Sequence, residues 1–221
     1  MRRPSGLKEP PRPFVLRAAH LDGRHFAPDE SFTVDVHVFD LRARLLEKLE
    51  EAFAKLAIAG LGPGRGRVEL PGSASASVAA INLAAPMEPA TRIRVFFRTP
   101  AELKGNYSRD ELPFGVLFAR IRDRIATLCS LYGEEPLSID FAALGERANL
   151  VTTVSCDLEY HDVSRRSSRT GAVHGIGGFT GTMEYEGEVS EFLPYLRAAW
   201  WTGVGRHTVW GNGVIEVVVI G

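Results

Sequence analysis

The sequence predicts an α+β fold with antiparallel sheets, and three observations support this prediction. Short strand-like segments outnumber helical ones, the same order of elements recurs in the two halves of the chain, and each half carries a helix, a glycine-rich loop and then a strand. The 221 residues suffice for one large domain or two domains of about 100 residues each. We expect a flexible lead over residues 1–12, a partial first domain with a linker over 13–90, and a second domain over 91–221.

The first half begins with two strand-like segments and a helix. Residues 14–19 and 32–39 cluster or alternate apolar side chains as strands do, and a polar loop separates them. Over residues 41–58 apolar side chains recur every three or four positions. This spacing predicts an amphipathic helix that ends at Gly60.

A glycine-rich loop over residues 60–67 follows this helix, and residues 68–70 open a further strand. Residues 73–89 are small, weakly patterned and flanked by prolines, so we expect them to form the linker.

The second half contains four expected strands and two expected helices. The strands are predicted at 93–98, 151–160, 179–185 and 214–220, and the helices at 113–132 and 191–201. The order strand, helix, strand, strand, helix, strand is the ferredoxin-like (RRM-like) pattern. The first half shows the same pattern without its opening strand and helix. The sequence therefore predicts tandem ferredoxin-like domains, the first one incomplete, in the manner of a degenerate duplication.

Composition places the chain among ordinary globular proteins and excludes a uniformly basic nucleic-acid binder. The formal net charge is -1, so any basic surface must be local. No apolar run reaches the roughly 18 residues of a membrane helix, and the N-terminus lacks the apolar core of a signal peptide, so we expect a cytoplasmic protein. Cys129 and Cys156 show no CxxC spacing, which favours free thiols over a disulfide.

The strongest functional motif is the segment over residues 203–213. Glycines bracket a basic and aromatic centre there, and the residues concerned are Gly203, Gly205, Arg206, His207, Trp210, Gly211 and Gly213. One interpretation is a phosphate cradle, in which backbone amides and Arg206 hold RNA while His207 and Trp210 serve proton transfer or stacking. The other is a tight connection, in which the glycines only permit close packing of a helix on a sheet.

An arginine-rich segment over residues 161–174 is the second candidate. Arg165, Arg166 and Arg169 stand there among serines and threonines, between two expected strands. Arginine pairs bidentately with phosphate, which predicts RNA contact, although a solvated hairpin turn is also often rich in arginine. Arg65 and Arg67, in the first glycine-rich loop, are a weaker candidate, because ordinary surface arginines beside a helix end explain them as well.

The histidines divide into two groups. His20 and His25 fall in a loop where we expect exposure, and His37 lies mid-strand where we expect packing against a partner element. His161, His174 and His207 lie near the basic, glycine-rich segments, and an imidazole suits general acid–base work on a ribose hydroxyl. No pair of histidines has metal-ligand spacing beside acids or cysteines, so we expect neither a metal nor another cofactor. Walker A, G-x-S-x-G and HExxH motifs are absent from the sequence.

Several segments, in order along the chain, resemble a known family. They are residues 13–15, 60–67, 92–100, 164–171, 177–181 and 203–213, the last followed by a terminal strand. Together they resemble the CRISPR-associated endoribonucleases that mature guide RNA, which belong to the repeat-associated mysterious protein (RAMP) superfamily. The resemblance runs over most of the chain, from about residue 12 onward.

This resemblance implies two ferredoxin-like domains that bind CRISPR repeat RNA and cut it once without a metal. The attacking group is the adjacent 2′-hydroxyl, which leaves a 2′,3′-cyclic phosphate. Arg206 and the glycines of the 203–213 loop carry over as RNA contacts. Implied partners are the repeat RNA and other CRISPR-associated proteins, while an unpaired edge of the incomplete first sheet would also suit a homodimer.

The sequence departs from the family pattern at the catalytic histidine. In many members that histidine lies on or after the first helix of the first domain, and no residue here matches that position. Three explanations stay open: a truncated gene product, a base from elsewhere, for which His207 and His161 are the candidates, or a non-catalytic RNA-binding subunit of an interference complex. A ferredoxin-like domain unrelated to RNA is a further alternative.

Overall fold

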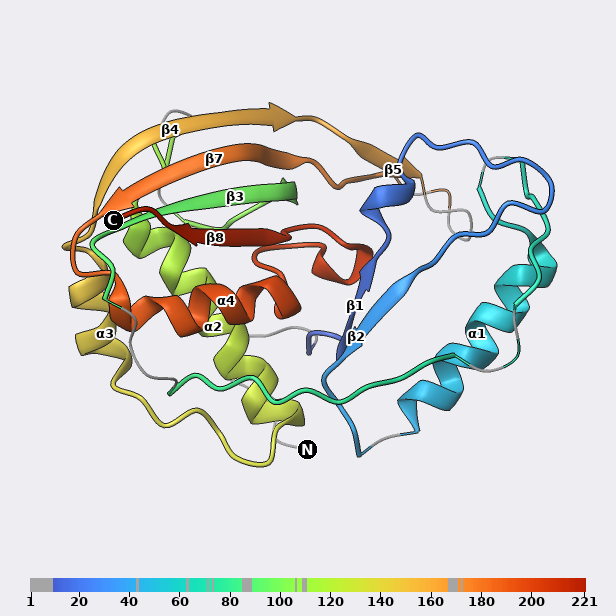
Figure 1. Ribbon diagram of the computed structural model, residues 1–221, viewed down its shortest axis with the longest axis horizontal. Coiled ribbons are helices and arrows are strands. Elements are labelled where there is room, and N and C mark those ends of the chain that lie inside the picture. The colour runs from blue at the N-terminus through green and yellow to red at the C-terminus, as the bar shows by residue number, and fades with distance from the viewer. Residues whose placement is uncertain are drawn as a thin grey trace.

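The computed structural model describes residues 10–42, 44–62, 64–70, 72, 74–84, 89–105, 107–108, 111–166, 171 and 173–221. The chain forms two parts that lie side by side, a larger one from β3 onward and a smaller N-terminal one (Figure 1). Most of the expected lead over residues 1–12 lies outside the described residues.

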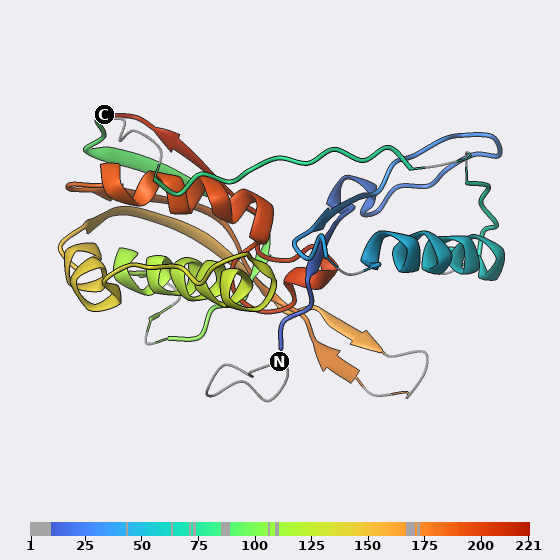
Figure 2. The ribbon, with the colours of Figure 1, turned by 90° about the horizontal axis from the view of Figure 1, so that it is seen from below.

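The larger part is built on a four-stranded antiparallel sheet. Its strands are β3 (Arg92–Ala101), β4 (Thr152–His161), β7 (Gly178–Glu186) and β8 (Ile215–Val219), in the spatial order β4-β7-β3-β8. Helices α2 (Phe114–Tyr132) and α4 (Leu193–Thr202) lie on one face of this sheet (Figures 1 and 2). A short 3-10 turn at Ser190–Phe192 leads into α4. This arrangement confirms the predicted ferredoxin-like fold of the second half.

Helix α3 (Phe141–Ala148) is an element that the sequence patterns did not predict. Asp140 caps it, since its carboxylate accepts hydrogen bonds from the backbone amides of Ala142 and Ala143. Eight residues with Gly145 among them are too short for a clear helical periodicity, so the capping aspartate was the available signal.

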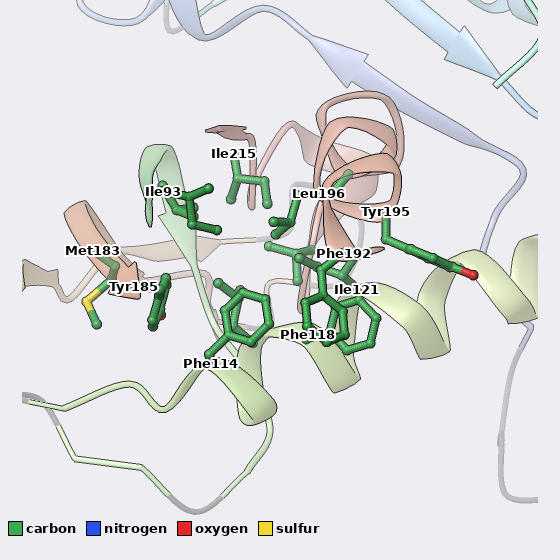
Figure 3. Close-up of a cluster of buried hydrophobic side chains, with 14 of the residues drawn as sticks. Ile93, Phe114, Phe118, Ile121, Met183, Tyr185, Phe192, Tyr195, Leu196 and Ile215 are labelled. Atoms are coloured by element: carbon green, nitrogen blue, oxygen red, sulfur yellow. The ribbon is translucent and has the colours of Figure 1, made fainter. Parts of the chain in front are cut away.

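The core lies between the sheet and the helices and is rich in aromatic rings (Figure 3). Phe114 packs edge-on against Tyr185 with ring centroids 5.1 Å apart, and Phe118 against Phe192 at 4.6 Å. The buried face of α2 confirms the predicted periodicity and includes Phe114, Leu117, Phe118, Ile121, Ile125 and Leu128. This rigid layer holds the ends of the strands at which the candidate site lies.

The N-terminal part contains strands β1 (Phe14–Arg17) and β2 (Asp35–Val38), paired antiparallel, and helix α1 (Leu45–Ala59). The helix lies at the outer end of the molecule (Figure 1). The strand expected over residues 68–70 is wrong, because this segment is irregular and Leu70 is exposed. The amide of Val68 donates to the carbonyl of Ala57 in α1 at 3.5 Å. No described strand pairs with residues 68–70.

The two parts meet at the C-terminal end of α4. The guanidinium of Arg17 donates to the carbonyls of Trp200 and Trp201, and the His37 ring shares a hydrogen bond of 3.0 Å with the carbonyl of Trp201. The rings of His37 and Trp201 lie 4.8 Å apart, which confirms that this histidine packs against a neighbouring element. Cationic side chains at a helix C-terminus are favourable, because the last carbonyls carry partial negative charge.

Arg124 of α2 joins the same contact by donating to the carbonyl of Thr202 at 2.7 Å. Burial lowers the pKa of Arg17 and of Arg124 to about 10, and the charge of Arg17 contributes at Arg124. Thr202 directly precedes the glycine-rich loop, so this junction fixes the point at which that loop begins.

Between β4 and β7 the chain forms a hairpin of its own, made of β5 (Ser164–Arg166) and β6 (Val173–Gly175). The hairpin projects away from the four-stranded sheet (Figure 2). None of the described helices is long and apolar enough to cross a membrane.

Candidate functional site

The glycine-rich loop connects α4 to β8 and turns repeatedly through the left-handed region. Its four glycines have φ between 69° and 92°. A Cβ at Gly205 would overlap the carbonyl oxygen of Glu102, and one at Gly213 would overlap that of Val204. Glycine is therefore required at these two positions by close backbone approach as well as by φ.

Most of the loop's amides are already used inside the protein. The amides of Gly203, Gly211 and Gly213 donate to the carbonyls of Ala199, Thr208 and Pro100, respectively. The same three glycines are buried, whereas Gly205 is half-buried. Their predicted contact with RNA stays a prediction, and their burial favours a role in shaping the loop.

Hydrogen bonds from strand β3 hold the loop in place. The buried hydroxyl of Thr99 donates to the carbonyl of Gly211 and accepts from the amide of Val214, both at 2.9 Å. The amide of Arg206 donates to the carbonyl of Glu102 at 2.9 Å. The loop is consequently held as a fixed protrusion at the end of the sheet.

Three side chains stand at the apex of this protrusion. Arg206 is exposed and pairs with the Glu102 carboxylate at 2.6 Å. His207 lies 3.4 Å from the other oxygen of the same carboxylate, and its ring stacks on that of Trp210 with centroids 5.1 Å apart. Trp210 is 43% exposed. We call Glu102, Arg206, His207 and Trp210 the apical cluster.

The backbone of His207 is itself unusual, with φ at 60° in the left-handed region. A non-glycine residue in this region costs free energy, and such residues concentrate at functional sites. The Thr208–Trp210 turn that follows brings the Trp210 ring parallel to the imidazole, with an interplanar angle of 2°. The strained backbone and the stacked indole together fix the direction of the imidazole.

Glu102 is the member of the apical cluster that the sequence patterns did not reveal. It follows the end of β3 directly and lies 104 positions from its partner Arg206. No local spacing links residues so far apart. The strand predicted at 93–98 ends four positions before Glu102, so the sequence patterns did not connect this carboxylate with the loop.

The second histidine candidate, His161, ends β4 and shares a hydrogen bond of 2.7 Å with the hydroxyl of Thr180. It lies at the base of the β5–β6 hairpin. The side-chain amide of Asn212 donates to the carbonyl of Ile176 at 2.9 Å, which ties the glycine-rich loop to the same hairpin base. The fold therefore brings the two candidate segments to one end of the sheet.

The arginine-rich segment occupies this hairpin. Arg165 and Arg166 lie in β5, paired with His174 and Val173 of β6, and Arg169 lies outside the described residues. Arg65 and Arg67 belong to the segment that follows α1. That segment lies at the outer end of the N-terminal part, away from β8 and the loop before it in both views (Figures 1 and 2). The structure thus brings the 203–213 and 161–174 segments together and leaves the first glycine-rich loop apart.

The face of the sheet that the helices do not cover is neutralised by its own ion pairs. Arg92 and Arg94 both contact Glu184, at 2.8 and 2.6 Å, and Arg98 contacts Glu216 at 2.6 Å. Hydrogen bonds from Arg92 and then Arg94 lower the pKa of Glu184. In the described ranges no group of three His, Cys, Asp or Glu side chains could hold a metal ion.

Comparisons with known proteins agree with this geometry. A family model described as CRISPR-associated endoribonuclease Cas6 matches residues 95–215, which is more than half of the chain, and a second model, described as an N-terminal domain, matches residues 2–81. A comparison with curated protein sequences finds no significant match.

Among solved structures, the chain is similar to the Thermus thermophilus Cas6 (TTHB231) product complex, with 19% identity and a TM-score of 0.60 over 96% of this chain and 84% of that one. It is also similar to the Cas6 (TTHA0078) product complex, with 21% identity and a TM-score of 0.53 over the same shares. At these identities the likeness shows the fold, which supports tandem ferredoxin-like domains.

Proposed function

Because the chain belongs to the CRISPR-associated endoribonuclease Cas6 family, we propose that it binds CRISPR repeat RNA at the glycine-rich loop and the arginine hairpin and cuts it there. The observation that carries this proposal is the apical cluster. It places a guanidinium, an oriented imidazole and an exposed indole on one rigid protrusion. These are the groups needed to hold a phosphate, move a proton and stack a base.

The proposed cleavage needs no metal ion. The 2′-hydroxyl loses its proton and attacks the adjacent phosphorus, the bond to the 5′-oxygen breaks, and the leaving 5′-oxygen takes up a proton from water. The products are a 2′,3′-cyclic phosphate and a 5′-hydroxyl. We assign His207 the removal of that proton. In the tautomer with hydrogen on Nε2, which faces Glu102, Nδ1 carries the lone pair that accepts it. Arg206 would stabilise charge that develops on the phosphate oxygens.

His161 is the alternative base. Its Nε2 shares a hydrogen bond with the hydroxyl of Thr180, which leaves Nδ1 to act on a substrate, as in His207. Arg165 and Arg166 of β5, together with Arg169 of the same sequence segment, are proposed as contacts to the RNA backbone. Association with other CRISPR-associated proteins or with a second copy through the β1–β2 sheet stays a prediction.

The test is cleavage of the cognate repeat RNA by the purified protein in excess EDTA. We expect one cut, a cyclic phosphate on the 5′ fragment, and no cut in a substrate with a 2′-deoxy nucleotide at the cleaved position. Removing a general base lowers rates by about 10²- to 10⁴-fold, so His207→Ala should abolish detectable turnover. His20→Ala, which removes an exposed loop histidine, is the matched control and should cut normally.

Binding without any cut would reject the nuclease assignment and favour the alternative, a non-catalytic RNA-binding subunit of an interference complex. Cleavage by His207→Ala at the normal rate, together with no cleavage by His161→Ala, would identify His161 as the general base. Failure of the wild type to bind repeat RNA even at low salt would overturn the RNA proposal as a whole.

A further inference from the structure

A second basic site includes Lys104 and Gly105, which follow Glu102 of the apical cluster in the chain. A cavity of about 260 Å³ opens between the residues after β3 and helices α2 and α3. Three cationic side chains line it, from Lys104, Arg120 and Arg122, and no carboxylate does so among the described residues. A water molecule's share of liquid volume is about 30 Å³, so this space admits a tetrahedral anion together with waters.

Glycines keep the cavity open. Gly105, Gly115 and Gly145 are all part of its lining. A Cβ at Gly115 would overlap the side-chain oxygen of Asn149, and one at Gly145 would lie 3.3 Å from a guanidinium nitrogen of Arg122. Side chains at these positions would displace the polar groups that face the space.

Arg122 has a fixed position in the wall of the cavity. Its three guanidinium nitrogens donate to the carbonyl of Phe141 at 2.7 Å and to the carboxylate of Asp123 at 3.0 and 3.3 Å, and its guanidinium lies over the Phe141 ring. These contacts fix the position of the charge. A cation ordered before binding loses little side-chain entropy when it meets a phosphate.

Arg120 and Lys104 supply the donors that have room for a ligand. The Nε of Arg120 is buried and has no hydrogen-bond partner among the described residues, although the same guanidinium contacts Asp123 at 3.2 Å. Lys104 is exposed and forms no ion pair with any other described residue. A buried donor without a partner costs free energy that an anion in the cavity would recover.

We propose that this cavity binds a phosphate group. Lys104 lies two residues beyond Glu102, and two residues of chain span at most about 7 Å, so the cavity begins close to the apical cluster. The phosphate comes either from the backbone of the same bound RNA, in which case the inference rests on the proposed function, or from free phosphate or a nucleotide. In the first case the cavity extends the RNA contact along the surface of the second domain.

The test compares two double variants that each remove two positive charges. Lys104→Gln with Arg120→Gln empties the cavity of its free donors and leaves Arg122, which supports α3, in place. Arg44→Gln with Lys48→Gln is the control on α1, where Arg44 has the same i,i+3 pairing to a carboxylate that Arg120 has. Equal melting temperatures would show that both variants fold.

Inorganic phosphate is titrated by calorimetry at constant ionic strength, and repeat RNA is titrated over a series of salt concentrations. We expect the cavity variant to lose phosphate binding and to bind RNA about tenfold more weakly at low salt. Its plot of log K against log salt should be shallower by about 0.7 for each phosphate of a single strand that the cavity no longer neutralises. The control variant should bind inorganic phosphate as the wild type does, and its RNA affinity should fall by much less than tenfold.

Abolished phosphate binding with unchanged RNA affinity assigns the site to free phosphate or a nucleotide. Weaker RNA binding than the control assigns it to the RNA backbone. Phosphate and RNA binding that both match the control overturn the inference. If the wild type binds no RNA, the proposed function fails, and the phosphate titration alone still decides the cavity.

Discussion

Gly213→Ala should destabilise the protein by about 3 kcal/mol, which would be a large effect for the addition of one methyl group. Gly213 has φ at 71°, and its new Cβ would overlap the carbonyl oxygen of Val204. An L-residue in this region costs about 1 kcal/mol. Relief of the overlap also displaces two hydrogen bonds of 2.9 Å, from the Val204 amide to Gly213 and from the Gly213 amide to Pro100, each worth about 1 kcal/mol.

Gly23→Ala is the matched control for this prediction. Gly23 has φ at 70°, and no atom lies within 4 Å of the position that a Cβ would take. The substitution therefore carries the conformational cost of about 1 kcal/mol and nothing more. At about 2–4 °C per kcal/mol for a chain of this size, thermal unfolding should show a melting temperature lower by roughly 6–12 °C for Gly213→Ala and by roughly 2–4 °C for Gly23→Ala. Equal shifts would refute the claim that close backbone packing selects glycine at position 213.

Three further outcomes follow from the described contacts. Burial lowers the pKa of His37 below its ordinary 6.5, so the unfolded chain binds the proton more readily; acidification from about pH 7 to pH 5 should lower the melting temperature of the wild type more than that of His37→Gln. Phe118→Ala should cost about 3–5 kcal/mol in urea unfolding, whereas Leu46→Ala on the exposed side of α1 should change stability little. Hydrogen bonds from two arginines of β3 lower the pKa of Glu184, so its stabilising effect is present above about pH 4.5 and fades below; Glu184→Gln should flatten the loss of stability on acidification from about pH 5 to pH 3, and an unchanged acid profile would contradict this.

Local patterns predicted the elements whose burial follows a regular period. The apolar side chains of α2 recur along one face, and that face is buried. The four strands of the larger part are equally regular, because each pairs over most of its length. Apolar periodicity indicates which face of an element is buried. It therefore predicts a helix or strand correctly where one face of that element packs against the rest of the protein.

The errors arise where local sequence and tertiary partner disagree. Residues 68–70 have strand-like composition but no neighbouring strand to complete a ladder among the described residues, and an isolated segment of that kind is not stable. The apical cluster shows the same limit at the site. Arg206 and His207 were visible in a local motif, whereas Glu102 joins them only because β3 and β8 are adjacent in the sheet.

Under the proposed function, the Arg206–Glu102 pair bears on how a chain with a net charge of -1 binds RNA at the glycine-rich loop. The pair is partly exposed, with 66% of the arginine side chain and 29% of the glutamate side chain accessible. Exposed ion pairs contribute about 0–1 kcal/mol, so a phosphate group can replace the carboxylate at little cost. Without a bound phosphate, Glu102 partly neutralises Arg206 and lowers its attraction for other anions. A phosphate that displaces the carboxylate from Arg206 leaves Glu102 with His207 as its remaining partner, which favours the tautomer that the proposed cleavage requires.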